Sequence, residues 1–318
     1  MERLLITGAS GFVGGAVLPR AVARGYQVVA YVLPGERLST EQDLERVEVV
    51  YGDVGDLRAL KRAMRGVELC LHIAGNTSFY ECDRGALVAV NVDGVHNVLR
   101  AAREEGVRRL VHTSSVAAVG YDPSGHPVDE KQRYNWPVGM PYMETKRDGE
   151  RAALAASTDL EVVVLNPATV LGPGGGSPAD RQLMAAISAG AGIIAPPGGM
   201  TICDIDDVAE AHMAALERGR SGQRYILGGP HLTHRELFSG LAEIFNSAKP
   251  ALDLPPWLLA AAGRVLWRLE RDLGWRTTIP GSALRVGAWK LYYASDKAER
   301  ELGYRSRSAE TIIRRTAV

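Results

Sequence analysis

The sequence predicts an α/β protein with a Rossmann-type, doubly wound parallel sheet and a smaller, mainly helical C-terminal cap that binds substrate. Three observations support this fold class. Short apolar runs alternate with helix-length patterns through the first half of the chain. A glycine-rich turn directly follows the first apolar run and opens the first helix. After Pro167 the composition shifts toward glycine- and proline-rich segments, which connect elements more often than they form sheet.

Each strand is predicted from a short apolar run that ends at a glycine or at polar residues. The predicted strands cover residues 3–6, 27–32, 47–50, 69–73, 110–113 and 162–165. Helices are predicted from the glycine turn to about residue 24 and over 57–65, 84–105 and 142–157. Gly25 and Gly106 are the expected stop signals of two of these helices.

The pattern divides the chain into two regions. Residues 1–168 are predicted to form the nucleotide-binding domain, and segments near 201–228, namely 202–208 and 224–227, are expected to return to its sheet. Residues 169–200 and 229–318 are predicted to form the substrate-binding region, with a mainly helical cap over 231–290.

Composition excludes several classes of protein. Lys and Arg together number 37, as do Asp and Glu, so no net positive field attracts nucleic acid or an anionic membrane. The three cysteines, Cys70, Cys82 and Cys203, show no metal-ligand spacing and are expected to be free thiols in a reducing compartment. The N-terminus has no signal-peptide pattern, and the apolar run 257–266 is interrupted by Arg264 and too short to span a bilayer. We therefore expect a cytoplasmic protein without a membrane span.

The glycine turn is the first candidate site. Gly8, Gly11 and Gly14 lie between an apolar strand and an apolar helix, where glycine allows a sharp turn and a close approach to the pyrophosphate of a dinucleotide. A glycine turn alone occurs in many α/β proteins, but this placement favours nucleotide binding. The predicted contacts at this turn are Gly8, Ser10, Gly11, Phe12 and Val13.

The end of the second strand bears on the choice between NAD and NADP. An acid there normally accepts the ribose hydroxyls of NAD, but Val32 and Leu33 occupy this place. Arg37 can pair with a 2′-phosphate, which favours NADP, although Glu36 adjoins it. NAD therefore stays open as the alternative.

Two further segments are expected to contact the cofactor. Asp53 can accept the adenine amino group while Val54 packs on the ring; the alternative is that Asp53 is only an acid at a helix start. The small residues after the fourth strand allow the backbone to lie against the cofactor, and these are Ile73, Ala74 and Gly75.

The second candidate site carries acid–base chemistry. Tyr142 and Lys146 are four residues apart and share one face of a helix. A tyrosine has a pKa near 10, and a neighbouring lysine cation lowers it toward the range useful for catalysis. Ser115 follows the fifth strand and is expected to polarise a substrate carbonyl; we prefer it to Ser114 because strand alternation places it on the side of Thr113.

Histidines and metals contribute little to this interpretation. His72, His112 and His212 are more consistent with packed or hydrogen-bonded core residues than with acid–base groups. No cluster of His, Cys and Asp residues indicates a metal site.

In these motifs the chain resembles the extended short-chain dehydrogenases/reductases, also called the NAD-dependent epimerase/dehydratase superfamily. The resemblance covers essentially the whole chain. It rests on the glycine turn, Asp53-Val54, the Asn-Val-Asp-Gly run at 91–94, Thr-Ser-Ser at 113–115, Tyr142 to Lys146, Asn166-Pro167 and the segment 297–304.

The resemblance implies roles for further residues. Ser115, Tyr142 and Lys146 would be catalytic, and Tyr142 and Lys146 would also contact the cofactor. It adds the cofactor contacts Thr113, Pro167 and Thr169. Substrate contacts would be Thr77, Ser78, Phe79, Ser115 and Asn166. Homodimers are common in the family, here through the helices at 84–105 and 142–157.

Three functions compete within this resemblance. The Asn-Pro-x-x-Val-x-Gly-Pro run at 166–173 is similar to that of dihydroflavonol 4-reductases and hydroxysteroid dehydrogenases, which implies an NAD(P)-dependent exchange of hydride between nicotinamide and a ketone or alcohol. A sugar-nucleotide epimerase with tightly bound NAD is the alternative, but Met200 stands where that branch has a basic residue for the diphosphate. A non-catalytic, NADP-binding redox sensor is the third.

Overall fold

The main sheet of the computed structural model has seven parallel strands in the order β10-β6-β5-β4-β1-β2-β3. The structure describes residues 1–317 apart from 39–45, 175, 177 and 278. The strands are β1 (Arg3–Thr7), β2 (Gln27–Val32), β3 (Val47–Tyr51), β4 (Leu69–His72), β5 (Arg109–Thr113), β6 (Glu161–Pro167) and β10 (Gln223–Leu227). The central strands are buried on both faces, as expected for a parallel sheet covered by helices.

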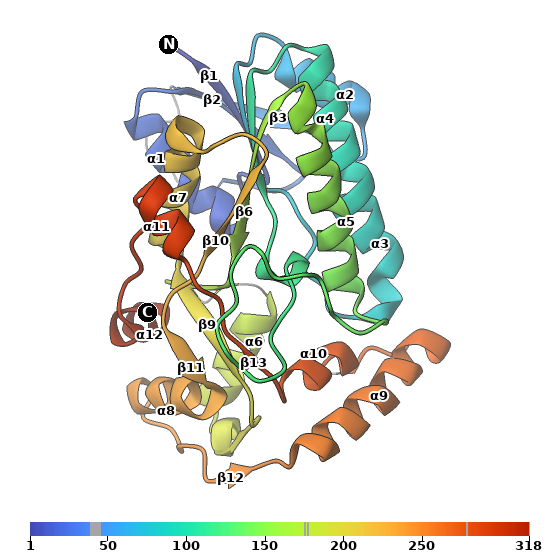
Figure 1. The fold of residues 1–318 in the computed structure, drawn as a ribbon, viewed down its shortest axis with the longest axis vertical. Coiled ribbons are helices and arrows are strands. Elements are labelled where there is room, and N and C mark those ends of the chain that lie inside the picture. Colours follow the sequence, from blue (N-terminus) through green and yellow to red (C-terminus); the bar gives the residue numbers. More distant parts are fainter. Residues whose placement is uncertain (39–45, 175, 177, 278, 318) are drawn as a thin grey trace.

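Helices cover both faces of this sheet (Figure 1). One layer contains α1 (Phe12–Ala23), α7 (Ile205–Arg218) and α11 (Asp296–Leu302), whose apolar residues share a core with one side of the strands. The other layer contains α2 (Leu57–Met64), α4 (Gly94–Glu104) and α5 (Pro141–Ala155). The predicted doubly wound α/β fold is therefore confirmed.

The predicted helix at 84–105 is a composite. It consists of α3 (Arg84–Val88), a π-helical turn at Ala89–Asp93 and α4. At the π turn, α5 approaches so closely that a Cβ on Gly149 would lie 2.1 Å from the carbonyl oxygen of Asn91. Only glycine permits this approach, which brings α5 against the segment that follows β4.

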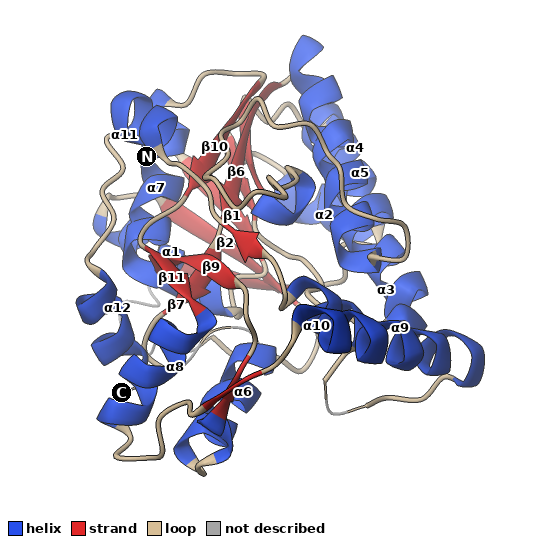
Figure 2. Ribbon diagram, turned by 60° about the horizontal axis from the view of Figure 1, so that its bottom comes forward, coloured by secondary structure: helices blue, strands red, loops and turns tan. Residues whose placement is uncertain are grey.

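The remaining elements build a second region beside the carboxyl ends of the main strands (Figure 2). β9 (Gly199–Asp204) pairs with β7 (Thr169–Leu171), β11 (His231–Thr233) and β13 (Lys290–Leu291), and β8 (Ile194–Ala195) pairs with β12 (Leu252–Asp253). The helices of this region are α6 (Pro178–Ser188), α8 (His234–Ile244), α9 (Pro256–Leu273), α10 (Gly281–Val286) and α12 (Ala309–Thr316).

One expectation about the main sheet is wrong. Residues 224–227 return to it within β10, but 202–208 do not, because β9 belongs to the small sheet. The side chain of Asp204 accepts a hydrogen bond from the backbone N–H of Asp206 at 2.9 Å, and this cap ends the strand and begins α7.

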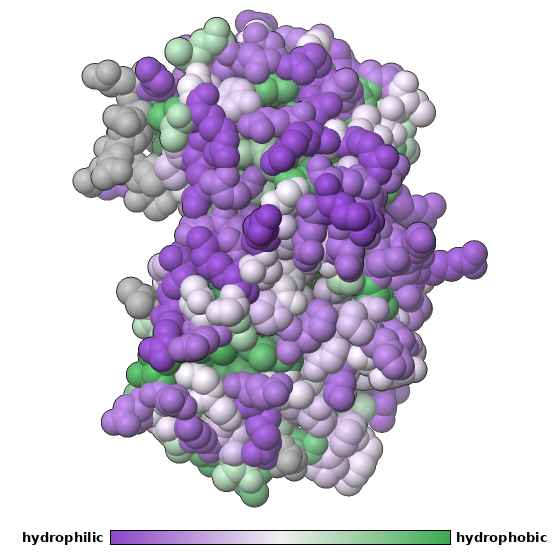
Figure 3. All heavy atoms as spheres, turned by 60° about the vertical axis from the view of Figure 1, so that its left-hand side comes forward, coloured by the Kyte–Doolittle hydropathy of each residue, from purple (hydrophilic) through white to green (hydrophobic). Residues whose placement is uncertain are grey.

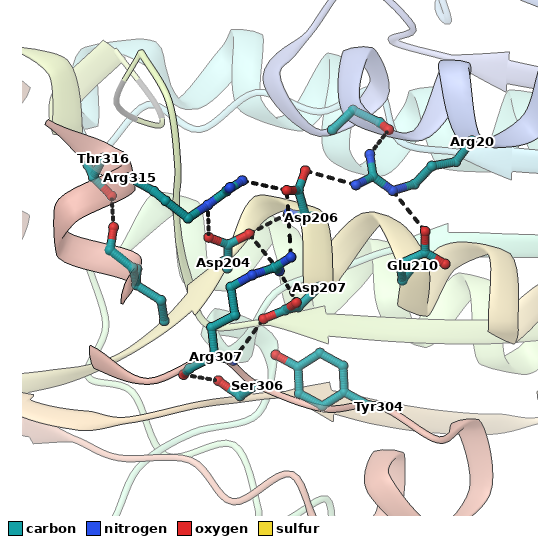
Figure 4. Close-up of polar contacts among 12 residues, drawn as sticks. Arg20, Asp204, Asp206, Asp207, Glu210, Tyr304, Ser306, Arg307, Arg315 and Thr316 are labelled. Carbon is teal, nitrogen blue, oxygen red and sulfur yellow. Dashed lines mark hydrogen bonds and ion pairs between the residues drawn. The ribbon is translucent and has the colours of Figure 1, made fainter. Parts of the chain in front are cut away.

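An acid–arginine network joins the C-terminal segment to this helix start (Figure 4). Arg307 and Arg315 both reach the carboxylate of Asp204, at 3.0 and 2.9 Å, and also pair with its neighbours Asp207 and Asp206. Arg20 of α1 pairs with Asp206 from the other side, at 2.9 Å. The outer surface on this side of the molecule is largely hydrophilic, with smaller apolar patches toward its lower end (Figure 3).

Candidate active site

The glycine turn between β1 and α1 has the geometry that a dinucleotide requires. A Cβ on Gly14 would lie 2.1 Å from the carbonyl oxygen of Gly8, and one on Gly8 would lie 2.8 Å from the backbone of Ala74. Gly8 also has a φ of +69°, which side-chain-bearing residues rarely adopt. The N-cap of α1, Gly11, makes no side-chain cap, so the helix N-terminus presents backbone N–H groups suited to a phosphate. Phe12 and Val13 form the first turn of this helix.

The two charged residues near the expected ribose position have opposite effects on the binding of a 2′-phosphate. Arg37 is exposed, and within the described residues it makes no ion pair. Its neighbour Glu36 accepts a hydrogen bond from the Ser10 hydroxyl, which places a carboxylate against the glycine turn. A 2′-phosphate would be attracted by Arg37 and repelled by Glu36. The preference for NADP therefore stays a prediction.

The segment after β3 holds Asp53 at the surface. Its carboxylate accepts a hydrogen bond from Gly55 N at 2.7 Å, while the cap of α2 is made by Asp56. Asp53 is thus not the acid that starts this helix. The Tyr31 hydroxyl donates to the Asp53 carbonyl at 2.9 Å and supports the backbone here. Val54 is only 6% exposed, so just its edge reaches the surface.

Thr7 joins the ends of β1 and β4. Its hydroxyl accepts hydrogen bonds from Ile73 N and Ala74 N at 3.1 and 3.2 Å, and contacts His72 Nδ1 at 2.8 Å. The exposed Gly75 follows, and a Cβ there would lie 3.8 Å from Lys146 Nζ. The predicted cofactor segment and the predicted catalytic lysine are therefore neighbours.

Lys146 is buried on α5. Its ammonium donates to the Thr113 carbonyl at 2.9 Å, which ties the helix to the end of β5. Burial lowers the pKa of Lys146 to about 8, and the nearby Glu150 carboxylate partly opposes this shift.

Glu150 is the centre of a buried polar network that the sequence analysis missed. Its carboxylate accepts from the Ser114 hydroxyl at 2.6 Å and from the Asn166 amide, and it pairs with Arg224 at 2.9 Å. Arg224 in turn donates to the backbone carbonyls of Glu130 and Gln132. The spacing from Lys146 to Glu150 repeats the four-residue step from Tyr142, and this signal was present in the sequence.

The two serines after β5 have different environments. Ser114 is 5% exposed and its hydroxyl is engaged by Glu150, whereas Ser115 is half-buried. The Ser115 hydroxyl accepts from Ala117 N at 3.1 Å, an interaction that leaves its hydrogen for another acceptor. β5 ends at Thr113, so strand alternation does not extend to the two serines. They differ instead because the Ser114 hydroxyl is bonded to Glu150 and the Ser115 hydroxyl is not.

Asn166 is completely buried, and its amide nitrogen donates to the Ser115 carbonyl at 2.9 Å as well as to Glu150. Asn166 thereby holds the Ser115 backbone. Its buried Oδ1 has no hydrogen-bond partner among the described residues, and its contact with substrate stays a prediction. Local sequence could not reveal the bond to Ser115, because the contact joins segments 51 residues apart.

Tyr142 lies at an aromatic wall. It is half-buried, and its ring packs on Phe79 with 5.0 Å between centroids. Thr77 is exposed, and the Ser78 hydroxyl donates to Asp83 at 2.6 Å. Further aromatic residues of the same apolar cluster are Tyr121, Tyr134, Trp136 and Trp289. This cluster forms an apolar wall beside the carboxyl ends of β4 and β5. Ligands of doubly wound sheets bind at such strand ends, and we refer to this expected ligand site as the crevice.

The buried amide of Asn91 fixes the loop that leads to this wall. It accepts from Asn76 N at 2.8 Å and donates to the Asn76 carbonyl at 2.9 Å and to Thr145 Oγ1 at 3.3 Å. Asn91 thereby links the loop after β4 to the helix turn between Tyr142 and Lys146.

Arg285 of α10 is a cation that the sequence analysis also missed. It is half-buried and donates to the Gly139 carbonyl at 3.3 Å, just before α5 begins. Burial and the neighbouring Arg264 lower the pKa of Arg285, while Tyr121 opposes the shift. Within the described residues it has no acidic partner.

His72, His112 and His212 are buried in the core, as predicted. His72 and His112 are buried side by side, and burial lowers the pKa of both, that of His72 to about 3. His212 donates to the Val208 carbonyl at 2.7 Å and contacts the Thr113 hydroxyl at 2.8 Å. The Thr113 side chain is therefore engaged in the core.

The remaining predicted cofactor contacts lie where β6 enters the second region, with Pro167 buried and Thr169 half-buried.

Cys70 and Cys203 are buried and Cys82 is exposed, all as free thiols. In the described part of the chain, no group of three or more His, Cys, Asp or Glu side chains is placed to hold a metal ion. The same residues include no helix that is both long and apolar enough to cross a bilayer.

Comparison with known proteins identifies the family. Residues 4–228 match the family described as "NAD dependent epimerase/dehydratase family". A Synechocystis sp. protein provisionally named dihydroflavonol 4-reductase is 32% identical over 94% of this chain and 88% of its own length. The 2-alkyl-3-oxoalkanoate reductase of Stenotrophomonas maltophilia is 30% identical over 95% and 94%. The crystal structure of gox2253 superposes with a TM-score of 0.84 at 31% identity, covering 99% of this chain and 97% of that one.

The fold and the glycine turn define a nucleotide-dependent enzyme of the Rossmann type. The chain belongs to the NAD-dependent epimerase/dehydratase family, within the extended short-chain dehydrogenases/reductases. It is accordingly a reductase or an epimerase.

Proposed function

We propose that this protein is an NAD(P)-dependent oxidoreductase that interconverts a ketone and an alcohol. The observation that carries the proposal is the position of Lys146, buried with its ammonium on the Thr113 carbonyl and one helical turn from Tyr142. The Ser115 hydroxyl lies at the end of the same strand, β5. The names of the relatives, which include ketone reductases, support this choice.

Each of the three side chains has a separate role in the reduction. When bound, the nicotinamide supplies the hydride that the carbonyl carbon receives. The Ser115 hydroxyl donates a hydrogen bond to the carbonyl oxygen and holds it beside the Tyr142 phenol. Tyr142 transfers its proton to that oxygen as negative charge develops there. The Lys146 cation stabilises the resulting phenolate.

The surrounding residues support this arrangement. Glu150 and Asn166 hold Ser114 and the Ser115 backbone, and Asn91 holds the loop before Phe79. The apolar wall favours a substrate with an apolar body. Preference for NADP, a cytoplasmic location and a homodimer built on α4 and α5 are further predictions of the same proposal.

The test is the substitution Tyr142→Phe. The Phe79 contact survives in phenylalanine, but the proton donor is lost, so we expect carbonyl reduction to fall about 10²- to 10⁴-fold with cofactor binding retained. Oxidation of NADPH and NADH at 340 nm with a panel of aryl and alkyl ketones measures the rate.

Tyr134→Phe is the matched control. Tyr134 belongs to the same aromatic cluster, and its buried hydroxyl has no hydrogen-bond partner among the residues that the structure describes, so removing it should leave the rate within about twofold. Equal rates in the Tyr142→Phe variant and the unchanged protein would refute the role of Tyr142.

A second candidate function is sugar-nucleotide epimerisation, and Arg285 is the observation that favours it. A half-buried arginine without an acidic partner suits an anionic group such as a diphosphate. Tightly bound NAD in the purified protein, together with turnover of a UDP-sugar without net cofactor consumption, would establish this function instead. Cofactor binding without turnover of any carbonyl, alcohol or UDP-sugar would leave the non-catalytic redox sensor.

A further inference from the structure

Helix α9 is anchored to the body of the protein by its inner side only. The buried Glu270 accepts from Gly281 N at 2.7 Å, and the Trp267 indole donates to Glu81 at 3.0 Å. Leu259 and Gly263 complete the buried side, where Gly263 lets the chain of α10 approach. Both ribbon views show α9 at the outer edge of the molecule, with α10 packed beside it (Figures 1 and 2).

The outer side of α9 and the segment after it expose a set of large apolar side chains. Trp257, Val265, Leu273 and Trp275 are 58–69% exposed, and Leu258 and Ile279 are 41% and 52% exposed. Leu258, Val265 and Leu273 are seven and eight residues apart, so they fall on one side of the helix. A contiguous apolar stripe of this kind marks an interaction surface rather than scattered surface residues.

A row of arginines runs beside this stripe. Arg264, Arg268 and Arg271 follow one another at spacings of four and three residues, and all three are exposed. Arg271 pairs with the adjacent Asp272. Within the described residues, neither Arg264 nor Arg268 makes an ion pair. The outer side of α9 therefore combines an apolar stripe, tryptophans near both ends and a net positive charge, because three arginines face the single acid Asp272.

We propose that α9 docks the protein onto an anionic lipid surface. The apolar stripe would enter the boundary between headgroups and acyl chains, the two tryptophans would lie at headgroup depth, and the arginine row would contact anionic headgroups. Since the described helices include none that can span a bilayer, α9 lies along the surface rather than across it. This inference is independent of the reaction that the crevice catalyses.

Charge decides between a lipid surface and a second copy of the chain. If two copies met through α9, the arginine rows would approach each other, and like charges lower the stability of such an interface. An anionic surface instead gains favourable contacts from Arg264 and Arg268, worth about fivefold in affinity each. The position of α9 adds a consequence: α10 bonds the Phe79 carbonyl through Ser282, so docking brings the apolar wall of the crevice near the lipid.

Co-sedimentation of the full chain with vesicles tests the proposal. We expect binding to vesicles of phosphatidylcholine with phosphatidylglycerol, little binding to phosphatidylcholine alone, and weaker binding as ionic strength rises. The double substitution Arg264→Gln/Arg268→Gln should weaken binding about 25-fold. Leu258→Ser/Val265→Ser should weaken it by about tenfold or more.

Matched controls come from the opposite end of the molecule (Figure 1). Arg58→Gln/Arg62→Gln removes two exposed arginines at the same spacing on α2, and Tyr51→Ser removes a 56% exposed apolar side chain on the edge strand β3. Neither control should change vesicle binding. Far-ultraviolet circular dichroism and melting temperature confirm that each variant is folded.

Three results would overturn the proposal. The first is equal sedimentation with anionic and neutral vesicles, and the second is an equal loss of binding in the α2 and α9 variants. The third is a dimer in analytical ultracentrifugation that Leu258→Ser/Val265→Ser breaks while neither the unchanged protein nor any variant binds vesicles; the stripe would then be an interface between copies.

Discussion

Two acid–arginine networks stabilise this protein, and they differ in the number of carboxylates that pair with the arginines. Behind the crevice, the single carboxylate of Glu150 serves Ser114, Asn166 and Arg224, and its side chain is 4% exposed. At the C-terminal segment, three aspartates share Arg307, Arg315 and Arg20, and these arginines are 23–34% exposed. The first network has no substitute for its central group. In the second, Asp204 and Asp206 each keep an arginine when one is removed, whereas among the described residues Asp207 pairs only with Arg307.

The two ion-pair networks also have different roles in the protein. The Glu150 network touches Ser115 through Asn166 and Lys146 through its charge, so it sets the geometry and the protonation of the proposed catalytic groups. The network around Asp204 joins α12, the segment before it and α1 to the start of α7, so it holds the C-terminal segment on the domain (Figure 4). We expect the first to affect both activity and stability, and the second mainly stability.

The largest effect is expected for Glu150→Gln. This substitution leaves the Arg224 guanidinium, whose side chain is 20% exposed, without its buried carboxylate partner, which should lower the free energy of unfolding by about 3–5 kcal/mol. Chemical denaturation measures the loss, and kcat/KM for the ketone should fall as Ser115 and Lys146 lose their support.

Glu161→Gln is the control for this prediction, because it also removes an acid that is paired with an arginine, Arg109. The Glu161 side chain, unlike that of Glu150, is 47% exposed. The cost of this substitution should stay below about 1 kcal/mol. Similar losses in both variants would mean that burial does not distinguish the two ion pairs.

The pH dependence of activity tests the role of the Lys146 cation. Its pKa is about 8 in the folded protein, against 10.5 for an ordinary lysine, so the cation is lost above pH 8. Reduction that needs the cation should then fall about tenfold per pH unit above that value. Since Glu150 raises the pKa of Lys146, Glu150→Gln should move this decline to lower pH in a kcat/KM profile.

Stability follows the same titration with the opposite sign. Between pH 8 and 10.5 the unfolded chain binds a proton at Lys146 that the folded chain does not, so the contribution of this residue to stability rises with pH across that window. In Lys146→Met this rise should be absent from unfolding free energies measured at several pH values. Its persistence would assign the rise to another group.

A smaller effect is expected for Arg307→Met. Asp204 keeps Arg315 and the Asp206 N–H, while Asp207 loses its cation and keeps only the backbone N–H of residue 307. The loss should therefore be about 1.5–3 kcal/mol, measured by thermal unfolding, with kcat/KM unchanged. Arg314→Gln, in an exposed pair with Glu310, should cost less than about 0.5 kcal/mol. A loss of activity in Arg307→Met greater than its loss of stability would connect this network to the crevice.

Much of the fold was predictable because its signals are local. Apolar runs located the strands of the main sheet within one or two residues, except for 202–208. The glycine turn was predictable because the steric demand at Gly14 comes from Gly8 and Ala9, a few residues away. The demand at Gly8 also comes from Ala74, which only the folded chain brings close. Strand alternation did not explain the difference between Ser115 and Ser114, since β5 ends at Thr113.

The sequence by itself determined the strands of the main sheet, the glycine turn between the first strand and helix, and the helix that carries Tyr142 and Lys146. It could do so because periodicity and backbone sterics act over one or two turns. The tertiary structure alone decided that Glu150 meets Arg224, 74 residues away, and that Asn166 faces the interior. It also decided that Arg285 lies beside the crevice and that one side of α9 has no cover. These outcomes depend on which distant segments exclude water together, and that follows from packing rather than from local pattern.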